Sequence, residues 1–212
     1  AISIDDKEAA YIPLTHSYSN CPRQLNKKMV LDNLKSILED PQIKKYGHNL
    51  KADIITLARE GISLQGVVFD TMVASYLLDP SRSNHNLEDI ALQHLNRKNT
   101  PLKDLIGSGS KTISFQQVNI SRAGQFMAEE TTISHPLVSK LSLLLQEASM
   151  DHLFQEIELP LIQVLVEMEM HGVKIDQEFL RDISKNLERE LGHLEDQIYS
   201  LAGEQFNINS PK

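Results

Sequence analysis

Residues 46–79 constrain the fold of this chain more than any other stretch, because extended and helical patterns alternate within them. An extended segment over residues 44–48 leads into a helix predicted over residues 49–60, with Asn as its N-cap and Gly after its end. The apolar residues 66–69 then predict a short buried strand, and residues 71–78 predict a second helix. This alternation of strands and helices predicts a mixed α/β layer fold.

The flanking sequence extends this pattern. Residues 1–4 and 9–14 are predicted to form two strands around the polar turn at residues 5–8, which gives a β-hairpin. Apolar spacing predicts further helices over residues 25–40, 87–95 and 118–147, the last kinked at Pro136. Residues 96–114 are rich in Gly, Ser, Pro and Lys, and we expect a mobile loop there.

The pattern changes near residue 150, after which it is almost purely helical. One helix is predicted over residues 150–170 and a second over residues 178–202, joined by a short connection. The second helix has an apolar stripe formed by Leu180, Ile183, Leu187, Leu191, Leu194 and Ile198. We therefore predict two domains, residues 1–149 and residues 150–212.

Composition excludes several classes of protein. The single cysteine, Cys21, excludes an internal disulfide framework and a Cys-rich zinc site. No apolar run approaches the roughly 20 residues of a membrane span, and no signal pattern begins the sequence, so we expect a cytoplasmic protein without a membrane partner. The net charge of −8 opposes tight nucleic-acid binding by the chain as a whole, so a local patch or a neighbouring domain must supply such binding.

Asp53 is the first candidate for chemistry, because it lies about one turn inside the predicted helix over residues 49–60. A carboxylate in this place gains roughly 0.3–1 kcal/mol from the helix dipole, which can account for it without any function. The alternative is a metal ligand. That interpretation requires further ligands, because one carboxylate does not fix a divalent ion alone.

Three other acidic residues are candidates. The pair Glu129 and Glu130 lies on a predicted helix with Phe126 one turn before Glu130, and such a pair is commonly a solvated helix face. Asp70 ends a predicted strand, where α/β proteins place ligands. For Asp70 we favour a structural role as N-cap of the helix that begins at Thr71.

Other familiar sites are excluded. The eight histidines have no H-x-x-x-H spacing, and no G-x-G-x-x-G or P-loop pattern is present. Residues 107–111 resemble a phosphate loop superficially, but they lack its spacing and a preceding strand. Cys21 lies beside Pro22 without an evident base, which argues against a catalytic thiol.

Several segments together resemble the bacterial DNA polymerase I family, the family A polymerases. The resemblance to its 3′–5′ proofreading-exonuclease domain rests on Gly47–Asp53, Phe69–Met72 and Ser75–Leu78. The resemblance to the start of its polymerase domain rests on Glu156–Leu161, Met168–Asp176 and Phe206–Ser210. Together these segments extend over essentially the whole chain.

The resemblance implies an RNase-H-like (DnaQ-like) exonuclease fold, followed by a helical segment that leads to the polymerase thumb. In this family four acidic side chains hold two Mg²⁺ ions that hydrolyse the terminal phosphodiester. Asp53 matches the acid of the second motif, with Asn49 beside it as a substrate-binding residue. Glu130 stands where the family has an Asp, and Phe126 where it has the Tyr that orients water.

The departures from the family pattern bear on activity. The first motif, Asp-x-Glu, is expected upstream of residue 1, so the fold is expected to lack its first strand and two metal ligands. Residues 6–8 imitate this motif but lie in the predicted hairpin turn. Glu130 extends its carboxylate by one methylene, and a misplacement of ~1 Å can cost roughly a hundredfold in rate. Phe126 has no hydroxyl to orient water.

We therefore favour a fragment of a DNA polymerase I-type enzyme of DNA replication and repair, with a degenerate exonuclease-type domain that acts as a scaffold. Its expected partners are the remaining polymerase domain of the same protein and DNA, which the fragment itself binds weakly. One alternative is an active Mg²⁺-dependent proofreading exonuclease in the intact protein. Another is a ribonuclease-D-like RNA-processing nuclease, against which residues 156–176 argue.

Overall fold

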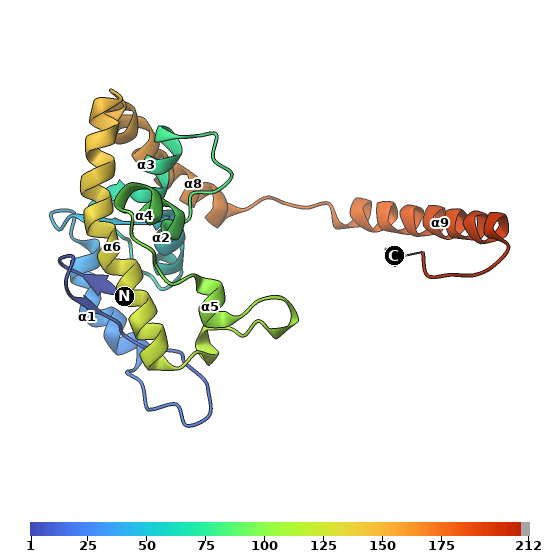
Figure 1. Cartoon of the computed structure of the whole chain (residues 1–212), viewed down its shortest axis with the longest axis horizontal. Helices are drawn as coiled ribbons and strands as arrows, with labels where there is room; N and C mark the ends of the chain where they lie inside the picture. The colour runs from blue at the N-terminus through green and yellow to red at the C-terminus, as the bar shows by residue number, and fades with distance from the viewer. Residues whose placement is uncertain (209–212) are drawn as a thin grey trace. The chain divides into compact units, whose positions relative to one another are not determined.

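The structure is a computed structural model that describes residues 1–208, and Figure 1 follows the chain along its length. The chain forms two compact units, one from Ala1 to Met170 and one that begins at His171. The boundary predicted between residues 149 and 150, from the change to an almost purely helical pattern, stays a prediction.

Four short strands form two separate two-stranded sheets in the described part of the chain. Strands β1 (Ile2–Ser3) and β2 (Ala9–Ala10) pair antiparallel, which confirms the predicted hairpin. Strands β3 (Lys45–Gly47) and β4 (Val67–Asp70) pair parallel, as expected for strands joined through a helix. The predicted α/β class is thus confirmed.

Most helices of the first unit follow the predicted apolar spacing. They are α1 (Lys27–Glu39), α2 (Leu50–Arg59), α3 (Thr71–Leu78), α4 (Leu87–Leu95), α5 (Leu102–Ile106), α6 (Ile120–Glu147), α7 (Asp151–Leu153) and α8 (Leu159–His171). Short 3₁₀ turns lie at Gly109–Lys111 and Phe115–Gln117, and a π-helical turn lies at Phe154–Glu158.

Two predictions about these helices need correction. The connection over residues 96–114, predicted as a mobile loop, contains helix α5. Its residue Leu105 is buried, which the local sequence does not reveal. The single helix predicted over residues 150–170 is divided by the π-helical turn, which contains the buried residue Phe154. Helix α6 runs through Pro136 as one element, and the kink predicted there stays a prediction.

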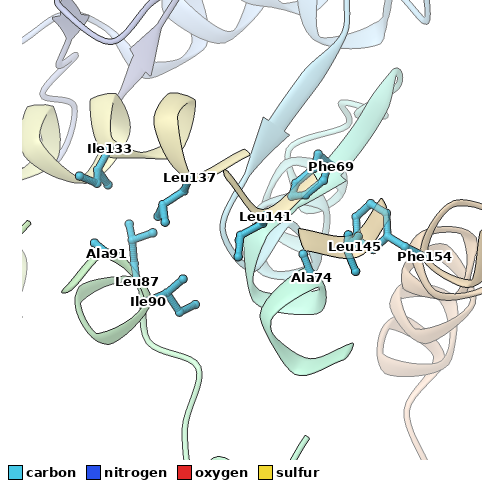
Figure 2. Packing of buried hydrophobic residues seen from close by; sticks show 10 residues of the cluster. All are labelled: Phe69, Ala74, Leu87, Ile90, Ala91, Ile133, Leu137, Leu141, Leu145 and Phe154. Carbon is cyan, nitrogen blue, oxygen red and sulfur yellow. The ribbon is translucent and has the colours of Figure 1, made fainter. Parts of the chain in front are cut away.

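Helix α6 organises the first unit. It contacts β1, β2 and β3 as well as α3 and α4, and so joins both sheets to the helical layer. Its buried side chains recur at about four-residue spacing and pack with residues from β4, α3 and α4. Figure 2 shows this core, which is made of Phe69, Ala74, Leu87, Ile90, Ala91, Ile133, Leu137, Leu141, Leu145 and Phe154.

Helix α8 packs on the α/β elements, although it belongs to the segment predicted as a second domain. Ile162 and Val166 of α8 form a buried cluster with Ile54 and Leu64. An ion pair of 2.6 Å between Lys51 Nζ and Glu169 Oε1 adds a polar contact between α2 and α8. Residues up to Met170 therefore fold with the first unit.

The second unit consists mainly of helix α9 (Gln177–Ala202), close to the predicted range. The side chain of Asp176 caps its start, and Gly203 in the left-handed conformation ends it. The predicted apolar stripe is present but exposed, and α9 has no buried residue. The resembling segment Phe206–Ser210 extends past residue 208, so Asn209 and Ser210 lie outside the described residues. Among the described helices, none is both long and apolar enough to span a membrane.

Candidate functional site

The candidate site begins at the turn between β3 and α2. Gly47 has no room for a side chain here, because an added Cβ would lie 2.8 Å from Leu50 Cδ2. His48 follows, and its Nδ1 lies 3.0 Å from the Thr71 hydroxyl at the start of α3. Asn49 then adopts the left-handed conformation with φ 57°. This sharp turn directs α2, and with it Asp53, away from the strand.

Asn49 occupies the N-cap position of α2, as predicted, but its side chain makes no capping hydrogen bond. The backbone N–H groups of Asn49 and Leu50 instead donate to the carboxylate of Asp70, at 3.1 and 2.7 Å. The capping role expected of the Asn49 side chain is therefore performed by a residue of the neighbouring strand. The side-chain amide of Asn49 therefore does not cap the helix, and the substrate-binding role of Asn49 stays a prediction.

Asp70 joins the starts of two helices. Its carboxylate is 1% exposed and also accepts hydrogen bonds from the N–H groups of Met72 and Val73, at 2.8 and 3.3 Å. The favoured interpretation of Asp70 as N-cap of α3 is thus confirmed. With four backbone donors around it, Asp70 is a structural residue that fixes α2 against α3.

Asp53 lies in the first turn of α2 and keeps an exposed side chain. Partial desolvation by the surrounding protein atoms nonetheless raises the pKa of its carboxyl above the ordinary value. The negative charge of Asp70 raises this pKa further. Asp53 is therefore an accessible carboxyl whose ionised form is less favoured than that of a free aspartate.

Phe126 lies on α6 and points into the protein. It is 7% exposed and packs in a cluster with Leu105, Val118 and Ala123. Its ring centroid lies 6.3 Å from that of Phe115. The structure therefore places Phe126 in a small apolar core, where its ring contributes to packing.

Glu130 lies one turn further along α6 and is also turned inward. Burial raises the pKa of its carboxyl to about 7, the neighbouring Asn99 amide lowers it, and the negative charges of Glu88 and Glu129 raise it further. Neither Glu130 Oε1 nor Asn99 Nδ2 makes a hydrogen bond, although both atoms are buried. Glu130 is thus a largely desolvated carboxyl that is partly protonated near neutral pH.

Glu129 has a different environment from its neighbour. Its Oε2 accepts hydrogen bonds from the N–H and hydroxyl of Thr100, at 3.3 and 2.8 Å. The interpretation of the Glu129–Glu130 pair as one solvated helix face is therefore wrong. Glu129 binds the loop before α5, while Glu130 is desolvated, because α4 and residues 96–101 fold back over this side of α6.

The structure does not bring the predicted metal ligands into one cluster. The negative charge that acts on Asp53 is that of Asp70, whereas those that act on Glu130 come from Glu88 and Glu129. Within residues 1–208, no three His, Cys, Asp or Glu side chains are grouped so that they could hold a metal ion. The catalytic and metal-binding roles of Asp53, Glu130 and Phe126 stay predictions.

A polar contact that the sequence did not suggest links the two sheets. His135 of α6 hydrogen-bonds through Nε2 to the Ser3 hydroxyl of β1, at 3.0 Å, and through Nδ1 to the Tyr46 hydroxyl of β3. A shallow cavity of about 840 Å³ lies beside this contact. It is lined by Ile4, Asp5, Asp6, Tyr46, His135, Pro136, Val138, Ser139 and Lys140. No local pattern could indicate this contact, because its three residues are far apart in the sequence.

The acidic motif imitated by residues 6–8 lies in the turn between β1 and β2, as predicted. The turn is closed by Asp5, whose Oδ1 accepts hydrogen bonds from the N–H groups of Lys7 and Glu8, both at 2.9 Å. These carboxylates therefore belong to an exposed turn.

Comparison with known proteins decides the family. The sequence profile of the 3′–5′ exonuclease domain of DNA polymerase A matches residues 1–146, more than half of the chain. The chain belongs to this exonuclease family. The predicted resemblance is thereby confirmed, and the coarse prediction of an exonuclease-like α/β fold with it.

Curated relatives of this exonuclease-family chain extend the match to its whole length. It is 38% identical over 215 residues to DNA polymerase I of Pseudomonas aeruginosa, covering 100% of this chain and 24% of the relative. It is 35% identical to DNA polymerase I of Rhizobium leguminosarum, covering 96% of this chain and 21% of the relative. The chain thus spans a quarter or less of the length of these relatives.

Solved structures give the same result for the fold. The polymerase domain of Pol1 from M. smegmatis, in complex with a DNA primer-template and dNTP, superposes with a TM-score of 0.64 at 27% identity. That match covers 85% of this chain and 28% of the other. Brucella melitensis NrnC superposes with a TM-score of 0.55 at 22% identity, covering 66% of this chain and 65% of the other, which supports a shared fold alone.

Proposed function

We propose that this chain is part of a DNA polymerase I-type enzyme of DNA replication and repair, in which the exonuclease-type domain is degenerate and serves as a scaffold. The observation that carries the proposal is the environment of Glu130, which stands at the third acidic position. Its carboxyl is turned toward Asn99 and has a pKa of about 7, so it is only partly ionised at neutral pH, and a metal ion would have to displace its proton. Phe126, at the position of the water-orienting tyrosine, is buried in apolar packing.

The residues present do not fit the two Mg²⁺ ions of the family. Mg²⁺ prefers ionised oxygen ligands in near-octahedral geometry. Asp53 and Glu130 both have raised pKa values, and they respond to different charged neighbours. We therefore assign no hydrolytic step to these side chains.

A scaffold role agrees with the packing of the chain. Helix α8 lies in the segment that resembles the start of the polymerase domain. It is held on the α/β elements by a buried cluster in which its Ile162 and Val166 pack with Ile54 and Leu64. We propose that residues 1–149 form an RNase-H-like domain without its first strand. Residues 150–212 then begin the polymerase domain and lead to its thumb. In this arrangement DNA is bound mainly through the polymerase portion.

The proposal also accounts for the two separate sheets. Strands β1 and β3 both contact α6, but they do not pair with each other among the described residues. A strand between them would complete one sheet, which is where we place the missing first strand. The contact of His135 with Ser3 and Tyr46 lies on the α6 side of this position.

The decisive experiment measures trimming of a 3′-labelled single-stranded DNA by the intact gene product, with Mg²⁺ or Mn²⁺. The matched variants are Asp53→Ala, which removes the accessible acid, and Glu130→Asp, which restores the shorter family side chain. We expect no metal-dependent trimming by the unmodified protein and a gain on Glu130→Asp. Trimming by the unmodified protein that disappears in Asp53→Ala would establish the active proofreading alternative and reject the degenerate one.

A further inference from the structure

Helix α8 is held by buried contacts before its start and along its middle. In the π-helical turn that precedes it, Phe154 is 1% exposed, and its ring centroid lies 4.7 Å from that of Phe69 in the main core. Further along, Ile162 and Val166 pack with Ile54 of α2 in a second buried cluster. The start of α8 is therefore fixed to the main core, and its middle is fixed to α2.

The last turn of α8 makes a contact of a different kind. Glu169 Oε1 lies 2.6 Å from Lys51 Nζ of α2, and the two side chains are 51% and 33% exposed. Residues 141–173 contain six acidic residues and no Lys or Arg, so the cation of this pair has to come from outside that stretch. Positions 162, 166 and 169 are four and three residues apart, which places them on one face of the helix. This face of α8 therefore contacts α2 first through apolar side chains and then through an ion pair.

These contacts reach the start of α2. Lys51 is the second residue of that helix, and Ile54 follows within its next turn. The N–H groups of Asn49 and Leu50, just before and at the first residue of α2, donate to the carboxylate of Asp70, at 3.1 and 2.7 Å. The first turn of α2 is therefore held by two separate sets of contacts, one with β4 and one with α8.

We propose that α8 is a conformational link between the second unit and the first turn of α2, in which Val166 and Glu169 are positioning residues for Asn49 and Asp53. Glu169 lies two residues before His171, where the second unit begins, so a displacement of that unit acts on this ion pair before it acts on the main core. Contacts that break together couple the two ends of such a link, so loosening of α8 also loosens the start of α2. The link depends on packing, and it holds whether or not the exonuclease-type site is active.

The test is amide hydrogen exchange of the whole chain, followed by NMR. The N–H groups of Asn49 and Leu50 are the reporters, and that of Met72 is the reference, because it donates to the same Asp70 carboxylate from α3. Glu169→Gln removes the half-exposed ion pair and should speed exchange of the reporters about threefold, with Met72 unchanged. Lys51→Glu/Glu169→Lys restores the pair with its charges exchanged and should return both reporters to within about twofold of the unmodified chain.

A matched pair of variants tests the apolar part of the link. Val166 is 3% exposed in the cluster with α2, whereas Val164 on the same helix is 50% exposed. Changing either residue to Ala removes the same side-chain atoms and alters helix propensity equally. Val166→Ala should speed exchange of the two reporters about tenfold, and Val164→Ala less than twofold. Far-UV circular dichroism establishes that the variants are folded.

Three results would overturn the inference. Unchanged exchange of both reporters in Glu169→Gln and Val166→Ala would show that the start of α2 opens without α8. An equal acceleration at Met72 would attribute the effect to a general loss of stability. Equal effects of the two Val→Ala variants would attribute it to helix propensity. The measurement needs no DNA and no metal ion, so this inference and the trimming assay of the proposed function fail independently.

Discussion

The end of β4 and the middle of α6 each carry an inward-facing carboxyl, Asp70 and Glu130, and these two carboxyls differ in their hydrogen-bond partners. Asp70 accepts four backbone hydrogen bonds at the starts of α2 and α3. Glu130 has an oxygen that is buried without any hydrogen bond. Burial of a carboxyl therefore supports the fold in the first region and opposes it in the second, and the difference lies in the supply of donors.

Under the proposed function, this comparison explains how the family fold persists although the exonuclease chemistry is lost. The Asp70 region holds strand β4 and two helices by backbone hydrogen bonds, which do not depend on a metal ion or substrate. The Glu130 region instead gathers the carboxyls of Glu88, Glu129 and Glu130 itself. A chain can therefore keep the first region and lose the function of the second.

The largest expected effect is on the Asp70 region. Asp70→Ala leaves four backbone N–H groups without their acceptor, and we expect a loss of about 3 kcal/mol in the free energy of unfolding. Asp70→Asn keeps one oxygen and should lose less. Urea denaturation followed by circular dichroism measures both. Asp5→Ala, which also removes an acceptor of two N–H groups but in an exposed turn, is the control and should lose much less. An equal loss in the free energy of unfolding for Asp5→Ala and Asp70→Ala would contradict the structural role assigned to Asp70.

A smaller effect is expected at Phe126. Phe126→Tyr places a hydroxyl in the cluster of Leu105, Val118 and Ala123, where it lacks an evident partner, so stability should fall by about 1–2 kcal/mol. Phe115→Tyr is the control, since Phe115 is only half-buried and its hydroxyl can reach water. Thermal unfolding of both variants tests this. An unchanged stability of Phe126→Tyr would mean that the hydroxyl reaches solvent, and the two regions would then differ less than proposed.

The pH dependence of stability sharpens the comparison at Glu130. Its folded-state pKa of about 7 lies above the ordinary 4.5, so the folded protein binds this proton more tightly than the unfolded chain. The resulting stability is present below about pH 4.5 and is lost as the pH rises through 7. Glu130→Gln removes this loss and should stabilise the protein at pH 8 by about 1 kcal/mol, discounted for partial solvent screening. Parallel stability curves for the two proteins between pH 5 and pH 8 would contradict this.

The smallest expected effect is at Asp53. Because its side chain is exposed, Asp53→Asn should change the free energy of unfolding by no more than about 0.5 kcal/mol. Chemical denaturation at neutral pH measures this difference. A larger destabilisation would show that Asp53 has a structural role at the helix start, as Asp70 has.

Local patterns predicted the elements of this chain well where one short-range interaction decides them. Helices α1 to α4 and α9 follow apolar spacing and are bounded by capping or turn residues. At the start of α1, for example, the side chain of Asn26 accepts a hydrogen bond from the N–H of Met29. Helix α5 and the π-helical turn were missed, because each depends on a buried side chain, Leu105 or Phe154, whose neighbours are distant in the sequence.

The candidate site shows the same division. The motif residues from Gly47 to Asp53 and the capping role of Asp70 could be predicted, since a cap bonds to residues two or three positions ahead. The bonds from Asn49 and Leu50 to the same carboxylate could not, because they join residues about 20 positions apart. Positions 126 and 130 were identified from the resemblance, but not the direction in which their side chains point.

The sequence alone determined the order of the strands and most helices, and the exonuclease family, because these depend on local spacing and motif residues. Only the tertiary structure decided that Asp70 has four donors and that Glu130 Oε1 has none. A carboxyl's hydrogen bonds and desolvation depend on groups that the fold brings from elsewhere, as it brings Asn99 to Glu130. Whether an acidic residue stabilises the protein or binds a cation therefore depends on those neighbours.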